Sequence, residues 1–182
     1  MKKNYIKKIT LSGVLIAIGL VIPMFSPFKI VIEPASFTLA SHVAIFTAMF
    51  ISPSYAISVA IGTTIGFFLG GFPIIIVLRA FTHVVFATMG AFYLNKRSKK
   101  SLSVIKLRVF SFSIALIHAL GEVIVVSAFY FGNNINNNYL VAVILLVGLG
   151  TLVHSMVDFE IANIIVLPFK KQKDFQILFD RK

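Results

Sequence analysis

The 182-residue sequence contains no cysteine, no tryptophan and only six acidic residues. Without cysteine, disulfides and any metal or redox site that needs a thiolate are excluded. Charged residues make up 13% of the chain, about half of their share in an ordinary soluble domain. The hydrophobic fraction is 58% and the mean hydropathy is +0.96. A soluble fold of this size leaves too much surface in water to hide so many apolar side chains. The sequence therefore predicts an integral membrane protein.

The few acidic residues leave a net charge of +11. In a soluble domain this excess would suggest a nucleic acid as partner. Here the lysines and arginines lie beside hydrophobic runs, which is typical of residues that set membrane topology and contact anionic headgroups. We expect the lipid bilayer, and no nucleic acid, as a partner. The basic start and first apolar run lack a small-residue cleavage site, so we interpret them as a retained span and not as a signal peptide.

Six apolar runs follow one another along the chain, and the second and third are short. A spanning helix needs about 20 residues, so these two could be short spans or one long span kinked at Pro53. Basic residues decide between the two, because lysine and arginine tend to stay cytoplasmic. With six spans, nearly all of the lysines and arginines fall on the side of the N-terminus. The predicted spans are Ile9–Phe25, Leu39–Ile51, Tyr55–Leu69, Ile74–Leu94, Val109–Phe131 and Leu140–Leu167.

The predicted fold is therefore an all-α integral membrane protein with six transmembrane helices and cytoplasmic N- and C-termini. It forms a single membrane domain, residues 1–182. The basic clusters on the inner side would be Lys2 to Lys8, the loop from Lys96 to Arg108 with Arg97, Lys99 and Lys100, and the tail with Lys170, Lys171, Lys173, Arg181 and Lys182. The outer loops would be 26–38, 70–73 and the asparagine-rich segment 132–139. No loop is long enough for a soluble domain, and no glycine-rich phosphate loop is present, so energy for any work would come from another subunit or an ion gradient.

Small residues recur at four-residue spacing in two of the spans. Gly62, Gly66 and Gly70 lie in the third span, and Gly13 and Ala17 lie in the first. Such stripes let helices approach closely in lipid. For the third span this predicts packing within the chain. For Gly13 and Ala17, packing within the chain and contact with another subunit are both open.

Ionisable residues lie inside the predicted spans, where they are costly and usually face a cavity or one another. All four histidines are among them. Three pairs have i,i+4 spacing and so share a helix face. Helical rise places Arg79, Glu122 and His154 at similar depth, so we expect them to converge on a cavity in the outer half, with Asp158 and Glu160 nearer the inner face. The residues are His42, Arg79 with His83, His118 with Glu122, and His154 with Asp158 and Glu160.

This cluster could be a polar network that only holds helices together, or a pocket for a small polar molecule. Arg79 needs an anionic partner at its depth, and the partner would be Glu122 or a carboxylate on a ligand. A metal site is the less favoured reading, because no His-Glu-x-x-His spacing exists. We therefore expect no metal, no cofactor and no catalytic residue.

Several short motifs resemble one known family. They are Gly13-Val-Leu-Ile-Ala17, Phe37-Thr-Leu-Ala-Ser-His42, and Met49 to Ala56 before the glycine-spaced third span. With the six-span pattern, the long first outer loop and the missing ATPase, the chain resembles the substrate-binding (S) components of energy-coupling-factor (ECF) vitamin transporters. The stretch Arg79-Ala-Phe-Thr-His83, together with His42, is similar to the niacin-type subgroup. Pantothenate, folate-related and pyridoxine-type substrates stay open.

The resemblance implies a vitamin-capturing subunit without enzymatic activity. Its partners would be a membrane scaffold subunit, which Gly13 and Ala17 would face, and two ATPase subunits. The substrate would lie near the outer surface under the first loop, held by the fourth to sixth spans. This makes Arg79, His83, Glu122, His118, His154 and His42 the candidate substrate-binding residues, with a niacin-like carboxylate favoured.

Two other classes remain as alternatives. A self-contained secondary transporter would couple to ions through Glu122, Asp158 or Glu160, although the two halves of the chain show no convincing inverted repeat. A membrane enzyme would use the histidines and acids, but no recognised catalytic spacing supports it.

Overall fold

The computed structural model describes residues 2–32, 35–96, 103–130 and 137–169. The predicted basic residues Arg97, Lys99 and Lys100, those of the tail after residue 169, and most of the asparagine-rich loop lie outside the described residues. The described part is helical apart from one small hairpin and short turns. Its elements are α1 (Lys2–Phe25), β1 (Lys29–Ile32), β2 (Ala35–Thr38), α2 (Val43–Ile51), α3 (Pro53–Leu69), α4 (Ile74–Lys96), α5 (Val104–Tyr130), α6 (Asn137–Ala142), the π-helical segment η1 (Val143–Leu149) and α7 (Gly150–Phe169).

Four helical segments in the described ranges are long and apolar enough to cross a membrane. They lie in α1, in α4, in α5 and in the continuous run from α6 through α7. α3 is a shorter apolar helix of 17 residues, and α2 has only nine. Large apolar side chains such as Phe81 and Ile124 are exposed on the outside, as expected where lipid is the solvent. The helical, multi-pass membrane architecture is confirmed.

The break at Ser52 separates α2 from α3. Its backbone is fully extended, with φ −171° and ψ 163°, and its hydroxyl accepts the N–H of Tyr55 to cap α3. Pro53 follows in the first turn of α3, where a missing N–H costs nothing. The two helices then pack against each other. The two segments are therefore separate helices and not one continuous kinked helix.

The loop between α1 and α2 contains a two-stranded antiparallel hairpin that the sequence analysis did not predict. Lys29 pairs with Thr38 and Ile32 pairs with Ala35. The β-branched run of β1 suits extended backbone. After β2 the chain turns through Ala40, whose φ is +67°, so α2 begins at Val43 and not at Leu39 as predicted. An alanine rarely adopts this left-handed conformation.

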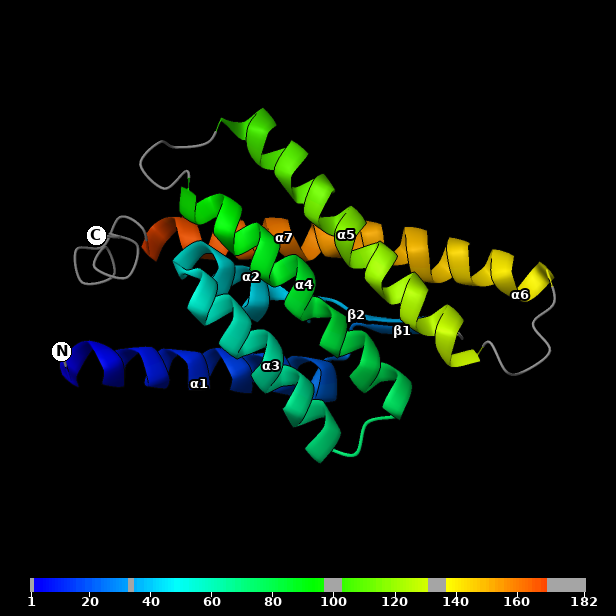
Figure 1. Ribbon diagram of the computed structural model, residues 1–182, viewed down its shortest axis with the longest axis horizontal. Coiled ribbons are helices and arrows are strands. Elements are labelled where there is room, and N and C mark those ends of the chain that lie inside the picture. The colour runs from blue at the N-terminus through cyan, green and yellow to red at the C-terminus, as the bar shows by residue number, and fades with distance from the viewer. Residues whose placement is uncertain (1, 33–34, 97–102, 131–136, 170–182) are drawn as a thin grey trace.

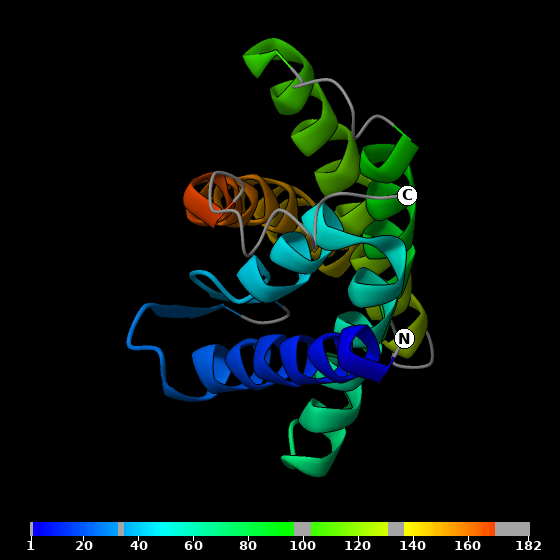
Figure 2. The ribbon, with the colours of Figure 1, turned by 90° about the vertical axis from the view of Figure 1, so that its left-hand side faces the viewer.

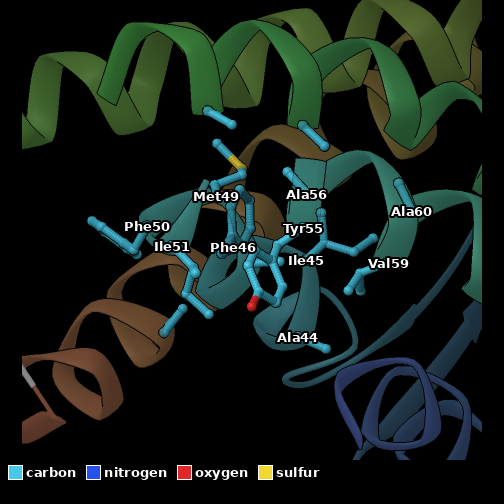
Figure 3. Close-up of a cluster of buried hydrophobic side chains, with 14 of the residues drawn as sticks. Ala44, Ile45, Phe46, Met49, Phe50, Ile51, Tyr55, Ala56, Val59 and Ala60 are labelled. Atoms are coloured by element: carbon cyan, nitrogen blue, oxygen red, sulfur yellow. The ribbon is translucent and has the colours of Figure 1, made fainter. Parts of the chain in front are cut away.

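The core of the protein surrounds α2. This helix contacts α1, α3, α4 and α7, and eight of its nine residues are buried. Figure 3 shows Phe46 and Met49 of α2 beside Ala56 and Val59 of α3 in this cluster. Because α2 is enclosed by protein on every side, its all-round apolar sequence reflects a buried helix.

The glycines of α3 pack inside the chain, as predicted. A side chain at Gly62 would collide with Ile16 of α1, and one at Gly66 would collide with Leu20. Gly70 instead ends α3 as its C-cap residue. The close approach of α1 and α3 therefore depends on the first two glycines of the stripe.

The helix ends gather at two opposite ends of the molecule. The start of α1, the end of α4, the start of α5 and the end of α7 lie at the same end in Figure 1. The end of α1, the α3–α4 turn, the end of α5 and the start of α6 lie toward the other end. Figure 2 shows the hairpin extending to one side beyond the end of α1.

Candidate functional site

The first polar centre joins α4, α5 and α7 around the buried carboxylate of Glu122. Arg79 Nη2 donates to Glu122 Oε2 at 2.8 Å, and Thr151 Oγ1 donates to the same oxygen at 2.6 Å. Arg79 Nη2 also lies 3.5 Å from the carbonyl oxygen of Ser36 in β2. These three side chains are buried, so the ion pair is shielded from water and connects the helices to the hairpin.

The guanidinium of Arg79 is only partly used by this pairing. It contacts Glu122 through one nitrogen, whereas an arginine can offer two parallel N–H groups to a carboxylate. Its Nε is buried and has no hydrogen-bond partner among the described residues. A buried unpaired donor is costly, and an acceptor on a bound ligand would remove that cost.

Two histidines approach the other oxygen of Glu122. His83 Nε2 lies 3.5 Å from Glu122 Oε1 and His118 Nε2 lies 3.4 Å from it. Neither nitrogen has the geometry of a hydrogen bond, and both are buried without such a bond in the described part of the chain. His118 Nδ1 lies 3.1 Å from Ser155 Oγ of α7, which fixes the orientation of its ring.

The second polar centre is the fully buried carboxylate of Asp158 in α7. Its Oδ1 accepts the N–H of Ala40 at 2.7 Å and its Oδ2 accepts the N–H of His42 at 2.9 Å. His42 Nδ1 lies 3.1 Å and His154 Nε2 lies 3.3 Å from Oδ2. A negative group at the start of a helix is favourable. His42, the N-cap residue of α2, provides no side-chain cap, and the carboxylate of Asp158 on α7 takes that place.

Of the two acidic residues expected nearer the inner face, Asp158 belongs to the polar cluster. Asp158 was expected nearer the inner face, away from the cavity that Arg79 and Glu122 line. The structure places it in contact with His42 and His154 of the same cluster. The backbone turn before α2 brings two N–H groups to this depth, and they determine where the carboxylate lies. Glu160 is half-buried and makes none of these contacts.

His42 connects the two centres. Its ring centroid lies 4.7 Å from those of His83 and His118 and 5.1 Å from that of His154. All four histidines of the sequence therefore meet in one cluster. His42 precedes α2 and the other three histidines lie on α4, α5 and α7, so the sequence could predict that the histidines face inward but not which ones touch.

A pocket opens beside this cluster, between α1, the hairpin, α4 and α7. Five of the six predicted binding residues line it, and His118 lies behind them against Glu122. Phe37 and Phe72 contribute aromatic walls. The pocket thus offers charge, hydrogen bonds and ring surfaces to a small molecule, which is typical of ligand sites. The predicted residues on its lining are His42, Arg79, His83, Glu122 and His154.

The sequence analysis missed the hydroxyl groups of this site. Ser41 Oγ lies 3.1 Å from both His42 Nδ1 and His154 Nε2, and Thr151 and Ser155 support Glu122 and His118. Serine and threonine are unremarkable inside a helix of a membrane protein. No sequence spacing distinguished Ser41, Thr151 and Ser155 from the other serines and threonines of the chain.

Gly13 and Ala17 lie elsewhere, on the outward face of α1. Both are exposed, and a side chain at Gly13 would meet nothing within 4 Å. Their stripe therefore does not pack inside the described part of the chain, and it forms a smooth strip on the surface.

A multi-pass helical bundle with a polar pocket between its helices is typical of a membrane transport protein. Over 163 residues the chain is 42% identical to the niacin transporter NiaX of Lactococcus lactis subsp. cremoris (strain MG1363), an alignment that covers 88% of this chain and 73% of that protein. No family model and no solved structure matches the chain. The chain belongs to the niacin-type family of S components, as its sequence motifs indicated. It is a multi-pass cell-membrane protein of a transporter family, which is not a family of enzymes.

Proposed function

We propose that the chain captures niacin, or a closely related small carboxylate, as the substrate-specific subunit of an ATP-driven ECF importer. The observation that carries this proposal is the partly used guanidinium of Arg79 on the wall of the pocket. The 42% identity to a niacin transporter supports the substrate class. Together they point to a ligand that is small, flat and negatively charged.

Arg79 is the anchor for the ligand carboxylate. Its planar fork suits a carboxylate better than lysine does, and Glu122 occupies only one of its nitrogens in the described structure. His42, His83 and His154 line the same pocket and offer ring surfaces to the heterocycle. Glu122 pairs with Arg79 on the pocket wall, and His118 contacts Glu122 from behind.

The proposed topology has six spans with both termini in the cytoplasm. α2 and α3 count as two spans, although α2 is short. The break at Ser52 and the packing of the two helices support this count. The helix ends that carry Lys7, Lys8, Lys96 and Arg108 lie at one end of the molecule, and basic residues favour the cytoplasmic side.

The proposed partners are a membrane scaffold subunit and two ATPase subunits. The sequence contains no phosphate-binding loop of its own. The exposed strip at Gly13 and Ala17 is smooth enough for a partner helix to approach closely. We therefore place the scaffold subunit on this face of α1.

The substrate assignment is tested by comparing niacin with its neutral amide. Purified chain, its Arg79→Lys variant and an Arg108→Lys control are titrated with both compounds by calorimetry. Arg108 is exposed, so its change should leave binding unaltered. Loss of one charge-assisted hydrogen bond weakens binding by about 1.5–3 kcal/mol, which is about ten- to 100-fold in Kd. We expect this loss for the acid in Arg79→Lys, and a preference of the wild type for the acid. Equal affinities, unaffected by the substitution, would show that Arg79 serves only the helix network.

The transport assignment is tested in vesicles. The chain alone should bind substrate without accumulating it, and accumulation should require the scaffold subunit, the ATPases and ATP. Uptake by the chain alone, driven by a proton or sodium gradient, would instead identify a self-contained secondary transporter.

A further inference from the structure

We propose that His42, His83 and His118, with Glu122 as a fourth ligand, form a binding site for a divalent transition-metal ion of the zinc and cobalt class. Each histidine offers a ring nitrogen, and these three nitrogens lie within 4.8 Å of one another. All three side chains are buried. The ligands come from the turn before α2, from α4 and from α5, so sequence spacing could not reveal the set.

The distances around Glu122 fit such an ion. Its Oε1 lies 3.5 Å from His83 Nε2 and 3.4 Å from His118 Nε2. In a tetrahedral zinc site with bonds of about 2.0–2.1 Å, neighbouring ligand atoms lie about 3.4 Å apart. The histidine nitrogens, which lie within 4.8 Å of one another, would need to approach by about an ångström to complete the site.

The two nitrogens that face Glu122 are the independent evidence for a ligand. His83 Nε2 and His118 Nε2 are buried and have no hydrogen bond in the described part of the protein. Both nitrogens face Glu122 Oε1, at 3.5 and 3.4 Å, without the geometry of a hydrogen bond. Buried polar atoms without a partner are rare in native proteins. A metal ion would satisfy both nitrogens and the oxygen at once.

The outer contacts also match a metal site. Metal-binding histidines usually use their second nitrogen to bind a carboxylate or another polar group, which fixes the ring. His42 Nδ1 lies 3.1 Å from Asp158 Oδ2, and His118 Nδ1 lies 3.1 Å from Ser155 Oγ. In both cases Nε2 is left for the ion.

The charge of the cluster favours a cation. Among the described buried residues it contains two carboxylates, Glu122 and Asp158, but one arginine, Arg79. With neutral imidazoles the cluster carries an excess negative charge, which is expensive inside a membrane. The alternative trio of His42, His154 and Asp158 is less suited, because both oxygens of Asp158 already accept backbone N–H groups.

The test uses tag-free protein, stripped with a chelator, desalted into detergent and titrated with zinc chloride by calorimetry. We expect one zinc ion per chain, and we expect cobalt(II) to give the intense visible absorption of a tetrahedral complex. His118 does not line the ligand pocket, so His118→Asn removes a metal ligand without opening the pocket wall. It should weaken zinc binding at least tenfold. Ser155→Ala removes only the outer contact and should weaken it about tenfold. The matched control His154→Asn should retain zinc binding within about threefold.

Several results would overturn the proposal. They are zinc binding that is absent or well below one ion per chain, an affinity unchanged in both His118→Asn and Ser155→Ala, or an equal loss in the His154→Asn control. If His118→Asn fails to fold, as judged by its thermal unfolding, Ser155→Ala and the cobalt spectrum of the wild type decide the question. Niacin binding is measured on the same preparation, so a failure of the metal site is distinguished from a failure of the proposed substrate.

Discussion

Replacing Asp158 by asparagine removes the acceptor on which the start of α2 depends. The carboxylate accepts two backbone N–H groups, from Ala40 at 2.7 Å and from His42 at 2.9 Å. The side chain is completely buried, so water cannot replace either bond. An asparagine has a single acceptor oxygen, and its amide group would oppose the second N–H as another donor.

The size of the effect follows from these contacts. A hydrogen bond to a charged group contributes about 1.5–3 kcal/mol. Asp158→Asn loses at least one such bond, and Asp158→Ala breaks the buried pairing altogether, at about 3–5 kcal/mol. In a protein of this size, 1 kcal/mol changes the unfolding midpoint by about 2–4 °C. We therefore expect a decrease of about 3–12 °C for Asp158→Asn and a larger one for Asp158→Ala.

The assay is thermal unfolding of purified protein in detergent, with Glu160→Gln as the matched control. Glu160 is an acidic residue of the same helix and is half-buried, and it makes no contact with the cluster. Hydrogen exchange adds a local measurement, because the amides of Ala40 and His42 should exchange faster in Asp158→Asn. Equal midpoints for the two variants, with unchanged exchange at these amides, would refute the role assigned to Asp158.

The remaining predictions concern helix contacts and the support of Glu122. Gly62→Leu should destabilise the protein by about 1–3 kcal/mol, because its new side chain collides with Ile16, whereas Gly13→Leu should leave the unfolding midpoint within a degree or two. The same Gly13→Leu variant should bind substrate normally in isolation yet lose transport with the partner subunits, and loss of binding would show that α1 packs differently. Thr151→Val should cost about 1.5–3 kcal/mol through loss of its 2.6 Å bond to Glu122, measured as a lower midpoint, and an unchanged midpoint would contradict this.

The sequence by itself determined the solvent of this protein and the course of most of its helices. Composition alone required lipid, because burial in a soluble fold of 182 residues could not hide its apolar surface. Local signals also located the break at Ser52-Pro53, the inward packing of Gly62 and the faces shared by residues spaced i,i+4. These features depend on neighbours a few residues away, and sequence reports such neighbours directly.

The tertiary structure decided which polar groups meet. Asp158 binds the backbone of His42 from 116 positions away, and Ser36 accepts from Arg79 only because the first loop folds into a hairpin. The left-handed turn at Ala40 shortens α2 and brings two backbone N–H groups to the carboxylate. Helical periodicity states which face a residue occupies, but it says nothing of how far one helix slides or rotates against another. Those two quantities placed His42 beside both His83 and His118, and they follow from the packing of the whole bundle around α2.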